Sequence, residues 1–203
     1  MSLIHLRATC GGMRTMKTVF GRLILLSLLS ATALASDLSD DTYSRWVDED
    51  GRITLPRDFR SQWIHLGSWL VDDAAAPGYG LHDVYTQQES VAYYRAKGEF
   101  PDGAILVKEV RAVASGPKTT GHAQWAGNPL IWFVMVKDAT QRRFQGSPHW
   151  GLGWGWSLYE AADPGKNVST GHQASCLACH TPAKETDWVF IEGYPTLLNP
   201  GSP

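Results

Sequence analysis

Three residues near the C-terminal end of the chain have types and a spacing that suit redox chemistry. Cys176 and Cys179 stand three positions apart, and His180 follows the second cysteine directly. Cys-x-x-Cys-His is the attachment motif of c-type haem. The thiols add to the two haem vinyl groups as thioethers, which holds the adjacent imidazole close enough to bind the iron axially. The motif therefore predicts haem c, with His180 as the iron ligand.

The same cysteine pair is also found in proteins of other classes. A thioredoxin-like redox site requires a strand that feeds a helix within a βαβ unit, and a zinc site requires a second pair of ligands. The sequence offers neither, since its only other cysteine is Cys10, in a segment that we expect to be removed. A plain disulfide between Cys176 and Cys179 is the main alternative to haem.

The first 35 residues resemble a targeting segment. They contain four basic residues and no acidic one, then an apolar run at 23–29 and Ala-Leu-Ala at 33–35. This order is typical of a Sec signal peptide, with cleavage after Ala35. The apolar run is much shorter than the ~20 residues of a membrane span, so we expect no membrane anchor. Export to the periplasm agrees with haem c, which is attached outside the cytoplasm, where thiols would otherwise oxidise.

The composition of the remaining chain limits its partners. Removing 4 of the 18 basic residues leaves 14 basic against 20 acidic residues, a mildly acidic protein. There is no basic patch or polybasic run, so neither nucleic acid nor a membrane surface is an expected partner. Residues 36–51 are acidic and polar and are expected to form a solvated lead-in. Residues 52–203 are long enough for a single domain with its own core.

Alternating and apolar segments between turn residues predict a sheet. The predicted strands are 63–71, 81–85, 104–114, 128–137 and 151–160, the last of these being the final strand. Residues 58–63 suggest a short helix. The capping-box spacing of Thr86 and Glu89, with Gly98 as a stop, predicts a second helix over 87–97. Several strands, few helices and a helical haem segment indicate an α+β fold with a mainly antiparallel sheet.

Lys108 interrupts the pattern of the strand at 104–114. Period-two alternation makes it the only polar residue on an otherwise apolar face. A lysine that faces a core is costly unless it is paired, neutral or chemically altered. One interpretation is that Lys108 reaches solvent or pairs with a carboxylate. The other is that a buried amine of lowered pKa acts as a nucleophile toward an electrophilic carbon of oxidised haem.

A second axial ligand is not evident. Met135 is the only methionine outside the first 35 residues, and it lies in the middle of a predicted strand, where packing is its expected role. Electron-transfer cytochromes c commonly use methionine as the second ligand. An electron carrier is therefore the less favoured class, and the distal side of the iron is expected to be open.

Four segments together resemble the cytochrome P460 family: residues 100–110, 150–156, 176–180 and 188–190. The resemblance extends from about residue 52 to residue 198. It implies a largely antiparallel and usually dimeric protein that holds a five-coordinate haem c. It also implies that the lysine matching Lys108 is bonded through its nitrogen to a porphyrin meso carbon.

The resemblance further implies an activity. Such enzymes oxidise hydroxylamine, with nitrous oxide and nitric oxide as outcomes, and an external redox protein accepts the electrons. The related cytochromes c′ of β type lack the lysine cross-link and bind nitric oxide or carbon monoxide, which makes a gas-binding protein the alternative. Lys108 is the feature that separates these two classes.

The proton acceptor of such a reaction is less defined. His82 falls where we expect a basic residue in relatives of this family, and Gln173 precedes the haem motif, so both are candidate catalytic residues. His172 and Ser175 flank Gln173 and are further candidates. Phe100 is a candidate haem contact, together with Tyr79, although aromatic side chains most often pack in a core.

Overall fold

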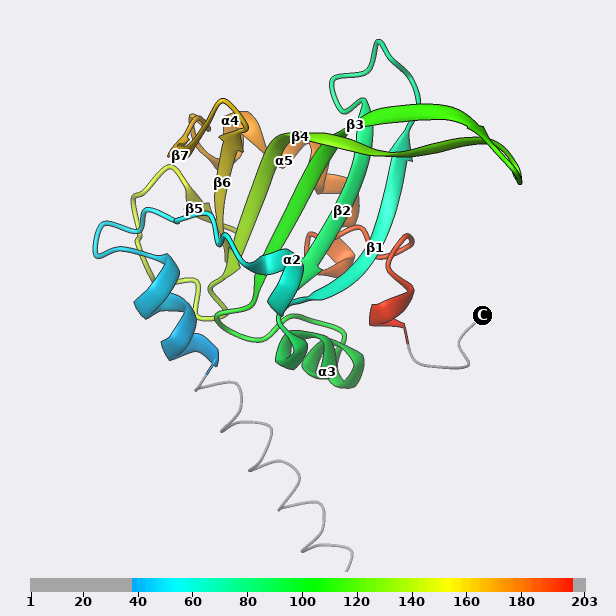
Figure 1. The fold of residues 1–203 in the computed structure, drawn as a ribbon. Helices are drawn as coiled ribbons and strands as arrows, with labels where there is room; N and C mark the ends of the chain where they lie inside the picture. Colours follow the sequence, from blue (N-terminus) through cyan, green and yellow to red (C-terminus); the bar gives the residue numbers. More distant parts are fainter. Residues whose placement is uncertain (1–37, 199–203) are drawn as a thin grey trace, which may run out of the picture. The chain divides into compact units, whose positions relative to one another are not determined.

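A computed structural model describes residues 38–198 (Figure 1). Contacts divide the chain into two units, residues 1–33 and residues 34–203, and all the described residues belong to the second. The predicted signal peptide at 1–35 lies outside the described residues. Among residues 38–198, no helix is long and apolar enough to cross a bilayer.

The fold is a seven-stranded antiparallel sheet with a few short helices, which confirms the predicted α+β class. The strand order is β1-β2-β3-β4-β6-β5, and β7 pairs with β6. The strands are β1 (Ile64–Val71), β2 (Gly80–Thr86), β3 (Ile105–Lys118), β4 (Gly121–Lys137), β5 (Trp150–Gly151), β6 (Trp154–Glu160) and β7 (Asp163–Asn167).

Three strand predictions were wrong in extent or number. β3 and β4 form a hairpin that continues past the predicted strand ends, so that it projects from the sheet (Figure 1). The predicted strand 151–160 divides into β5 and β6, because Leu152 and Gly153 have φ values of 60° and 78° and turn the chain. β7 was not predicted at all, since its sequence, Asp-Pro-Gly-Lys-Asn, consists of residues that strands disfavour.

The helices are short, and one cap differs from its prediction. They are α2 (Phe59–Gln62), α3 (Gln88–Lys97), α4 (His172–Ser175), α5 (Leu177–His180) and the 3-10 helices η1 (Thr181–Thr186) and η2 (Pro195–Leu197). α3 ends at Gly98, as predicted, with φ 75°. Its predicted capping box is absent, because the cap is Gln87 and the Thr86 hydroxyl donates to the Ile105 carbonyl, at 2.7 Å.

The segment predicted as a solvated lead-in forms a helix at residues 38–46. Thr42 is buried and donates to the Gly103 carbonyl at 2.6 Å, and Ser39 donates to the Asp102 carboxylate at 2.6 Å. The Tyr43 hydroxyl donates to the Lys137 carbonyl at 2.8 Å. The prediction failed because side chains of this helix bond to the turn that precedes β3 and to the last residue of β4.

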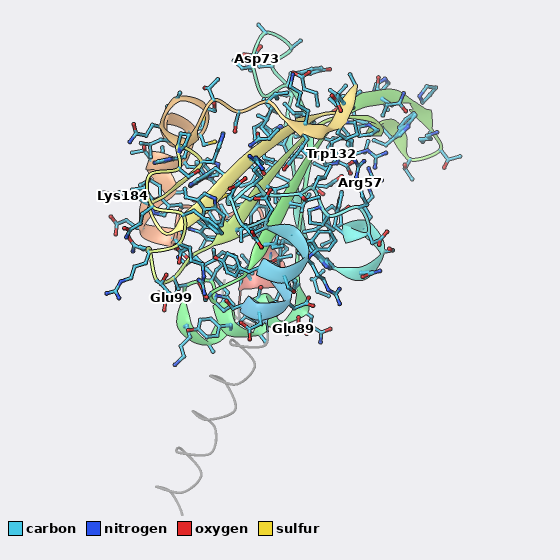
Figure 2. All side chains as sticks on the ribbon, turned by 90° about the vertical axis from the view of Figure 1, so that its left-hand side faces the viewer. Arg57, Asp73, Glu89, Glu99, Trp132 and Lys184 are labelled. Carbon is cyan, nitrogen blue, oxygen red and sulfur yellow. The ribbon has the colours of Figure 1, made fainter. Side chains whose placement is uncertain are left out.

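Both faces of the sheet are covered. The helix at 38–46 and α2 lie on one face, whereas α4, α5 and the C-terminal segment lie on the other (Figure 1). In the turned view, Arg57 and Lys184 mark these opposite sides (Figure 2). Each face carries its own cluster of buried side chains. The chain segment with the Cys-x-x-Cys-His motif is therefore held against one face of the sheet.

Candidate haem site

β3 presents Lys108 to the face that the motif segment covers. Lys108 is paired in register with Val84 of β2 and Phe133 of β4, and its Nζ lies 4.1 Å from the centroid of the Phe133 ring. The side chain is half-buried. Within residues 38–198, Lys108 makes no ion pair and no side-chain hydrogen bond. The alternative in which a carboxylate pairs with this lysine is thus not what the described structure contains.

The environment of Lys108 favours its neutral form. Burial lowers the pKa of the Lys108 ammonium, while the nearby thiols of Cys179 and Cys176 raise it less strongly. An amine with a lowered pKa has its lone pair free in a larger fraction of molecules and is therefore a better nucleophile. Lys108 thus has no counter-ion among residues 38–198 and is a neighbour of the two cysteines.

The opposite face of β3 carries a buried charge of the other sign. Glu109 is buried and accepts hydrogen bonds from the Arg60 guanidinium, including one from Nε at 2.9 Å, and from Trp132 Nε1 at 3.0 Å. Because neighbouring strand residues point to opposite faces, this network holds Lys108 on the motif side. Alternation along the strand is enough to place Glu109 opposite Lys108, but nothing in the sequence marks Glu109 as buried.

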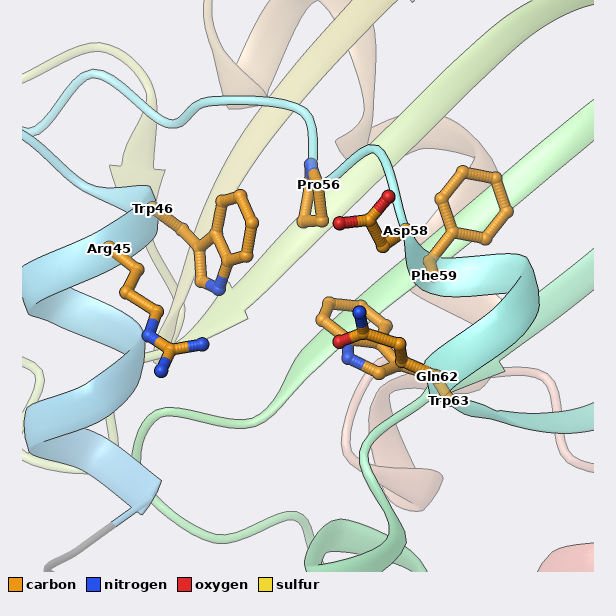
Figure 3. Close-up of a pocket in the computed structure, with 7 residues that line it drawn as sticks. All are labelled: Arg45, Trp46, Pro56, Asp58, Phe59, Gln62 and Trp63. Atoms are coloured by element: carbon orange, nitrogen blue, oxygen red, sulfur yellow. The ribbon is translucent and has the colours of Figure 1, made fainter.

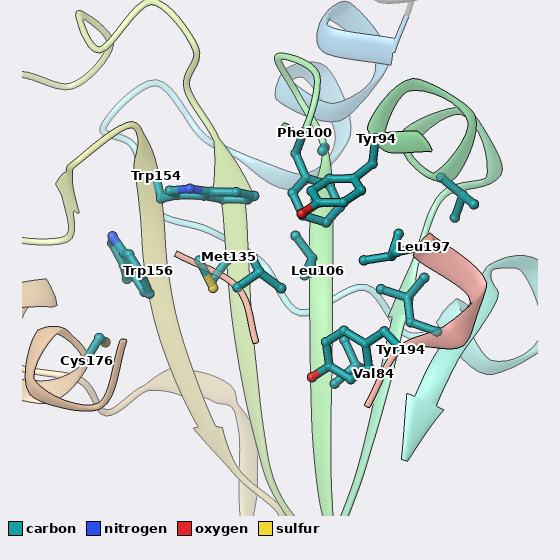
Figure 4. Close-up of a cluster of buried hydrophobic side chains, with 14 residues drawn as sticks. Val84, Tyr94, Phe100, Leu106, Met135, Trp154, Trp156, Cys176, Tyr194 and Leu197 are labelled. Atoms are coloured by element: carbon teal, nitrogen blue, oxygen red, sulfur yellow. The ribbon is translucent and has the colours of Figure 1, made fainter. Parts of the chain in front are cut away.

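The motif segment brings its two cysteines to the sheet. Both thiols are free, so the disulfide alternative is not formed in this structure. Cys176 is buried in the cluster that contains Leu106, Met135 and Trp156 (Figure 4), and Cys179 is exposed. Burial raises the pKa of the Cys176 thiol to about 11. The position of Met135 within this cluster agrees with its predicted packing role.

His180 is oriented by the backbone that follows it. Its Nδ1 lies 2.7 Å from the Trp188 carbonyl oxygen. A carbonyl only accepts, so Nδ1 carries the proton and Nε2 keeps a lone pair for a metal. Burial lowers the pKa of the imidazole, and Lys108 lowers it further, against the opposing effect of the hydrogen bond to Trp188. The Trp156 ring packs edge-on against the imidazole, with centroids 4.9 Å apart.

His82 lies on the same sheet face as Lys108. It is two residues before Val84, the register partner of Lys108 on β2. Its half-buried ring donates from Nε2 to the Gly78 carbonyl at 2.7 Å, which leaves Nδ1 as an acceptor. Burial lowers the pKa of His82, the Lys108 charge lowers it further, and the bond to Gly78 acts in the opposite direction. His82 is thus a neutral base near Lys108 at physiological pH.

The other candidate residues are placed differently. Phe100 is buried, with its ring 5.7 Å from that of Trp154, whereas Tyr79 is exposed in the loop between β1 and β2. Gln173 is exposed on α4. His172 and Ser175 have local structural partners, since His172 Nδ1 bonds to the Pro148 carbonyl at 2.9 Å and Ser175 Oγ accepts from the Thr170 N–H at 3.1 Å. Phe100 belongs to the buried cluster that contains Cys176, so it lies on the motif side of the sheet, whereas no described contact joins the other four candidates to Lys108.

A cavity of about 360 Å³ lies elsewhere in the molecule (Figure 3). It opens between the helix at 38–46 and α2, and its lining includes Arg45, Trp46 and Trp63. The two tryptophans pack against the cluster on the face opposite Lys108. This cavity is therefore separate from the candidate site. In the described part of the chain, no three His, Cys, Asp or Glu side chains are arranged to hold a metal ion.

The residues on the motif side fit haem. The sheet face on this side is rich in apolar and aromatic side chains. Beside it lie two free thiols in attachment spacing, an imidazole with Nε2 available and an amine without a counter-ion. The sequence did not mark the Trp188 carbonyl, which bonds to His180, or the ion pair of Lys137 with the neighbouring Asp187. Lys137 and Asp187 are 50 positions apart, and the Trp188 contact uses a backbone carbonyl, which every residue has, so no local pattern marks them.

Fold and site together define a class of protein in which an antiparallel sheet faces a Cys-x-x-Cys-His segment and presents one buried lysine to it. A sequence model of the cytochrome P460 family matches residues 56–191, and the chain belongs to this family of haem proteins. A search of curated proteins finds no match for the chain.

Proposed function

We propose that this protein is a mono-haem enzyme that oxidises hydroxylamine in the periplasm. In this proposal Cys176 and Cys179 attach haem c, His180 binds the iron, and Lys108 is bonded to a porphyrin meso carbon. The observation that carries the proposal is the half-buried Lys108 amine, which has no counter-ion among residues 38–198 and lies next to the two cysteines.

The charge of Lys108 explains why a covalent role is favoured. A cation removed from water without a partner destabilises the fold, and such groups are retained mainly where they serve a function. Bonding of the Lys108 nitrogen to a meso carbon replaces one N–H and one C–H bond by a C–N bond. It releases two protons and two electrons, which a peroxide accepts as it is reduced to water. The product amine no longer needs a counter-ion.

The protein's own groups then have distinct tasks. Bound haem supplies the iron that takes electrons from the substrate and passes them to an external redox protein. Conversion of two hydroxylamine molecules to nitrous oxide and water releases four protons and four electrons, so the site needs a base. His82 is the candidate, because it lies on the same sheet face as Lys108 and the bond from Nε2 to Gly78 leaves Nδ1 of its neutral ring as an acceptor.

The experiment is hydroxylamine turnover with an artificial electron acceptor, alongside ferrous absorption spectra. We compare the matured wild type with Lys108→Ala and with Lys118→Ala, a matched control at the far end of the same strand. Wild type and Lys118→Ala should oxidise hydroxylamine and show a strongly red-shifted Soret band, and Lys108→Ala should lose both. An ordinary c-type spectrum in the wild type, with nitric oxide binding but no turnover, would instead support the gas-binding class.

Two accompanying proposals concern location and assembly. The basic, apolar and small-residue order of residues 1–35 supports export, and the test is the mass of the periplasmic product, which should begin at Ser36.

We propose a homodimer on the family resemblance. The projecting β3–β4 hairpin exposes Trp125 at 40%, and Leu130, further along β4, is 46% exposed, which suits a contact surface. Light scattering measures the state directly.

A further inference from the structure

The chain after the motif contains an unusual turn. Asp187 and Trp188 have φ values of 58° and 67°, so two consecutive residues with side chains adopt the left-handed region. This region is unfavourable for residues other than glycine, and it persists where surrounding contacts impose it. Some interaction must therefore hold the backbone at this point.

The Asp187 carboxylate supplies that interaction. It accepts from Lys137 Nζ at 2.5 Å, from the Phe100 N–H at 2.9 Å and from Trp154 Nε1 at 3.3 Å. The Lys137 and Asp187 side chains are only 10% and 12% exposed, so this is a shielded ion pair. Lys137 ends β4 and Trp154 begins β6. The turn is thus fixed to the end of β4 and the start of β6.

The conformation of this turn also determines the directions of the Trp188 N–H and carbonyl groups. The Trp188 N–H donates to the Ala183 carbonyl at 2.9 Å, and the Trp188 carbonyl accepts from His180 Nδ1 at 2.7 Å. The hydrogen bond to His180 therefore depends on the conformation that Asp187 holds. Lys137 and Asp187 themselves do not touch the imidazole.

We propose that the Lys137–Asp187 ion pair is a positioning device for the proximal histidine. It fixes the turn so that the Trp188 carbonyl accepts a strong hydrogen bond from His180 Nδ1, which orients the ring and increases the basicity of Nε2 toward iron. A more basic axial ligand favours ferric over ferrous iron and so lowers the reduction potential. This inference rests on the proposed role of His180 as the iron ligand.

The test measures two properties of the holoprotein. These are the ferrous iron–histidine stretching frequency, from resonance Raman spectra, and the midpoint reduction potential. Both should change together if the ion pair positions His180, and neither should change if the ion pair only stabilises the fold. Asp187→Ala should shift the stretch to lower frequency and the potential upward. Asp187→Asn keeps the shape and the tolerance of the left-handed region and should give smaller shifts of the same sign. Lys137→Met, which leaves Asp187 in place, should also shift both in that direction.

A matched control comes from Asp102. This carboxylate pairs with Arg143 at 2.8 Å and accepts from the Ala139 N–H at 2.9 Å, so it resembles Asp187 in chemistry but contacts neither the turn nor His180. Asp102→Ala should leave the stretch and the potential at wild-type values. If Asp187→Asn and Lys137→Met also give wild-type values, the positioning role is wrong. The ligand assignment itself is tested with His180→Ala, which should remove the iron–histidine band of the wild type. If the wild type has no such band, or if His180→Ala keeps it, His180 is not the iron ligand.

Discussion

The Lys108 ammonium nitrogen lies 4.1 Å from the centroid of the Phe133 ring, its register partner on β4. An aromatic face compensates a cation by about 0.5–2 kcal/mol, much less than a hydrogen-bonded carboxylate in a buried pair. Lys137, on the next strand, has such a carboxylate in Asp187. Lys137 therefore has a counter-ion in the described structure, whereas Lys108 has only an aromatic ring.

That contrast predicts opposite effects on the stability of the haem-free protein. Lys108→Met should raise the free energy of unfolding by about 1 kcal/mol, because it replaces a cation without a counter-ion by an apolar side chain of similar length. Lys137→Met should lower it by about 3 kcal/mol, because Asp187 would remain buried without its partner. Urea unfolding at pH 7 measures both. Equal losses in the two variants would show that Lys108 is stabilised by a partner after all.

The lowered pKa of His82 predicts a pH dependence of stability. Because the pKa in the folded state lies below the ordinary value of 6.5, the unfolded chain binds more protons as the pH falls through that value. The stability contributed by neutral His82 is present above pH 6.5 and is lost on acidification toward the folded-state pKa. His82→Gln should therefore lose less of its thermal stability between pH 7 and pH 5 than the haem-free wild type loses.

The control for that comparison is His122→Gln, since His122 is exposed near the tip of the projecting hairpin. It should show the same pH dependence as the wild type. If the thermal stability of His82→Gln depends on pH just as that of the wild type and of His122→Gln does, His82 is not a buried neutral histidine.

Gly67 is expected to tolerate no side chain. A Cβ at this position would lie 1.9 Å from the Gly193 carbonyl oxygen, because the C-terminal segment crosses β1 in backbone contact. Overpacking of this kind costs about 1–3 kcal/mol, and Gly67→Ala should lower the thermal midpoint accordingly. Gly116→Ala is the matched control in β3, where the nearest atom to a Cβ would be 3.4 Å away. A midpoint equal to that of Gly116→Ala would show that the crossing is looser than described.

His180→Ala separates attachment from ligation. Two thioethers should keep haem on the chain in this variant, while the axial bond is lost. Denaturing electrophoresis with haem staining reports attachment, and the ferrous spectrum reports ligation. Retained staining with an altered spectrum is the expected result, whereas an unchanged spectrum would assign the axial bond to another residue.

Much of the sheet was predictable because its signals are local. Apolar runs located β1, β2 and the inner parts of β3 and β4, and alternation alone placed Lys108 and Glu109 on opposite faces of β3. The motif marks Cys176 and its neighbours as candidate haem-attachment residues from the sequence alone.

The rest depends on contacts that no sequence window contains. The helix at 38–46 looks solvated, because the acceptors of Thr42 and Ser39 lie about 60 residues further along the chain. The left-handed turn at Asp187 carries no glycine to mark it, since an ion pair to Lys137 stabilises it instead. Burial of Glu109 likewise depends on Arg60, which reaches it from α2.

The covalent bond between Lys108 and haem is the central claim, and peptide mass spectrometry of the trypsin-digested holoprotein tests it most directly. A bonded Lys108 is no longer a cleavage site, so we predict one haem-containing species that joins peptides 98–111 and 167–184. In Lys108→Ala the haem should stay on peptide 167–184 alone. A wild-type digest with haem only on 167–184, together with a free peptide 98–108, would contradict the account.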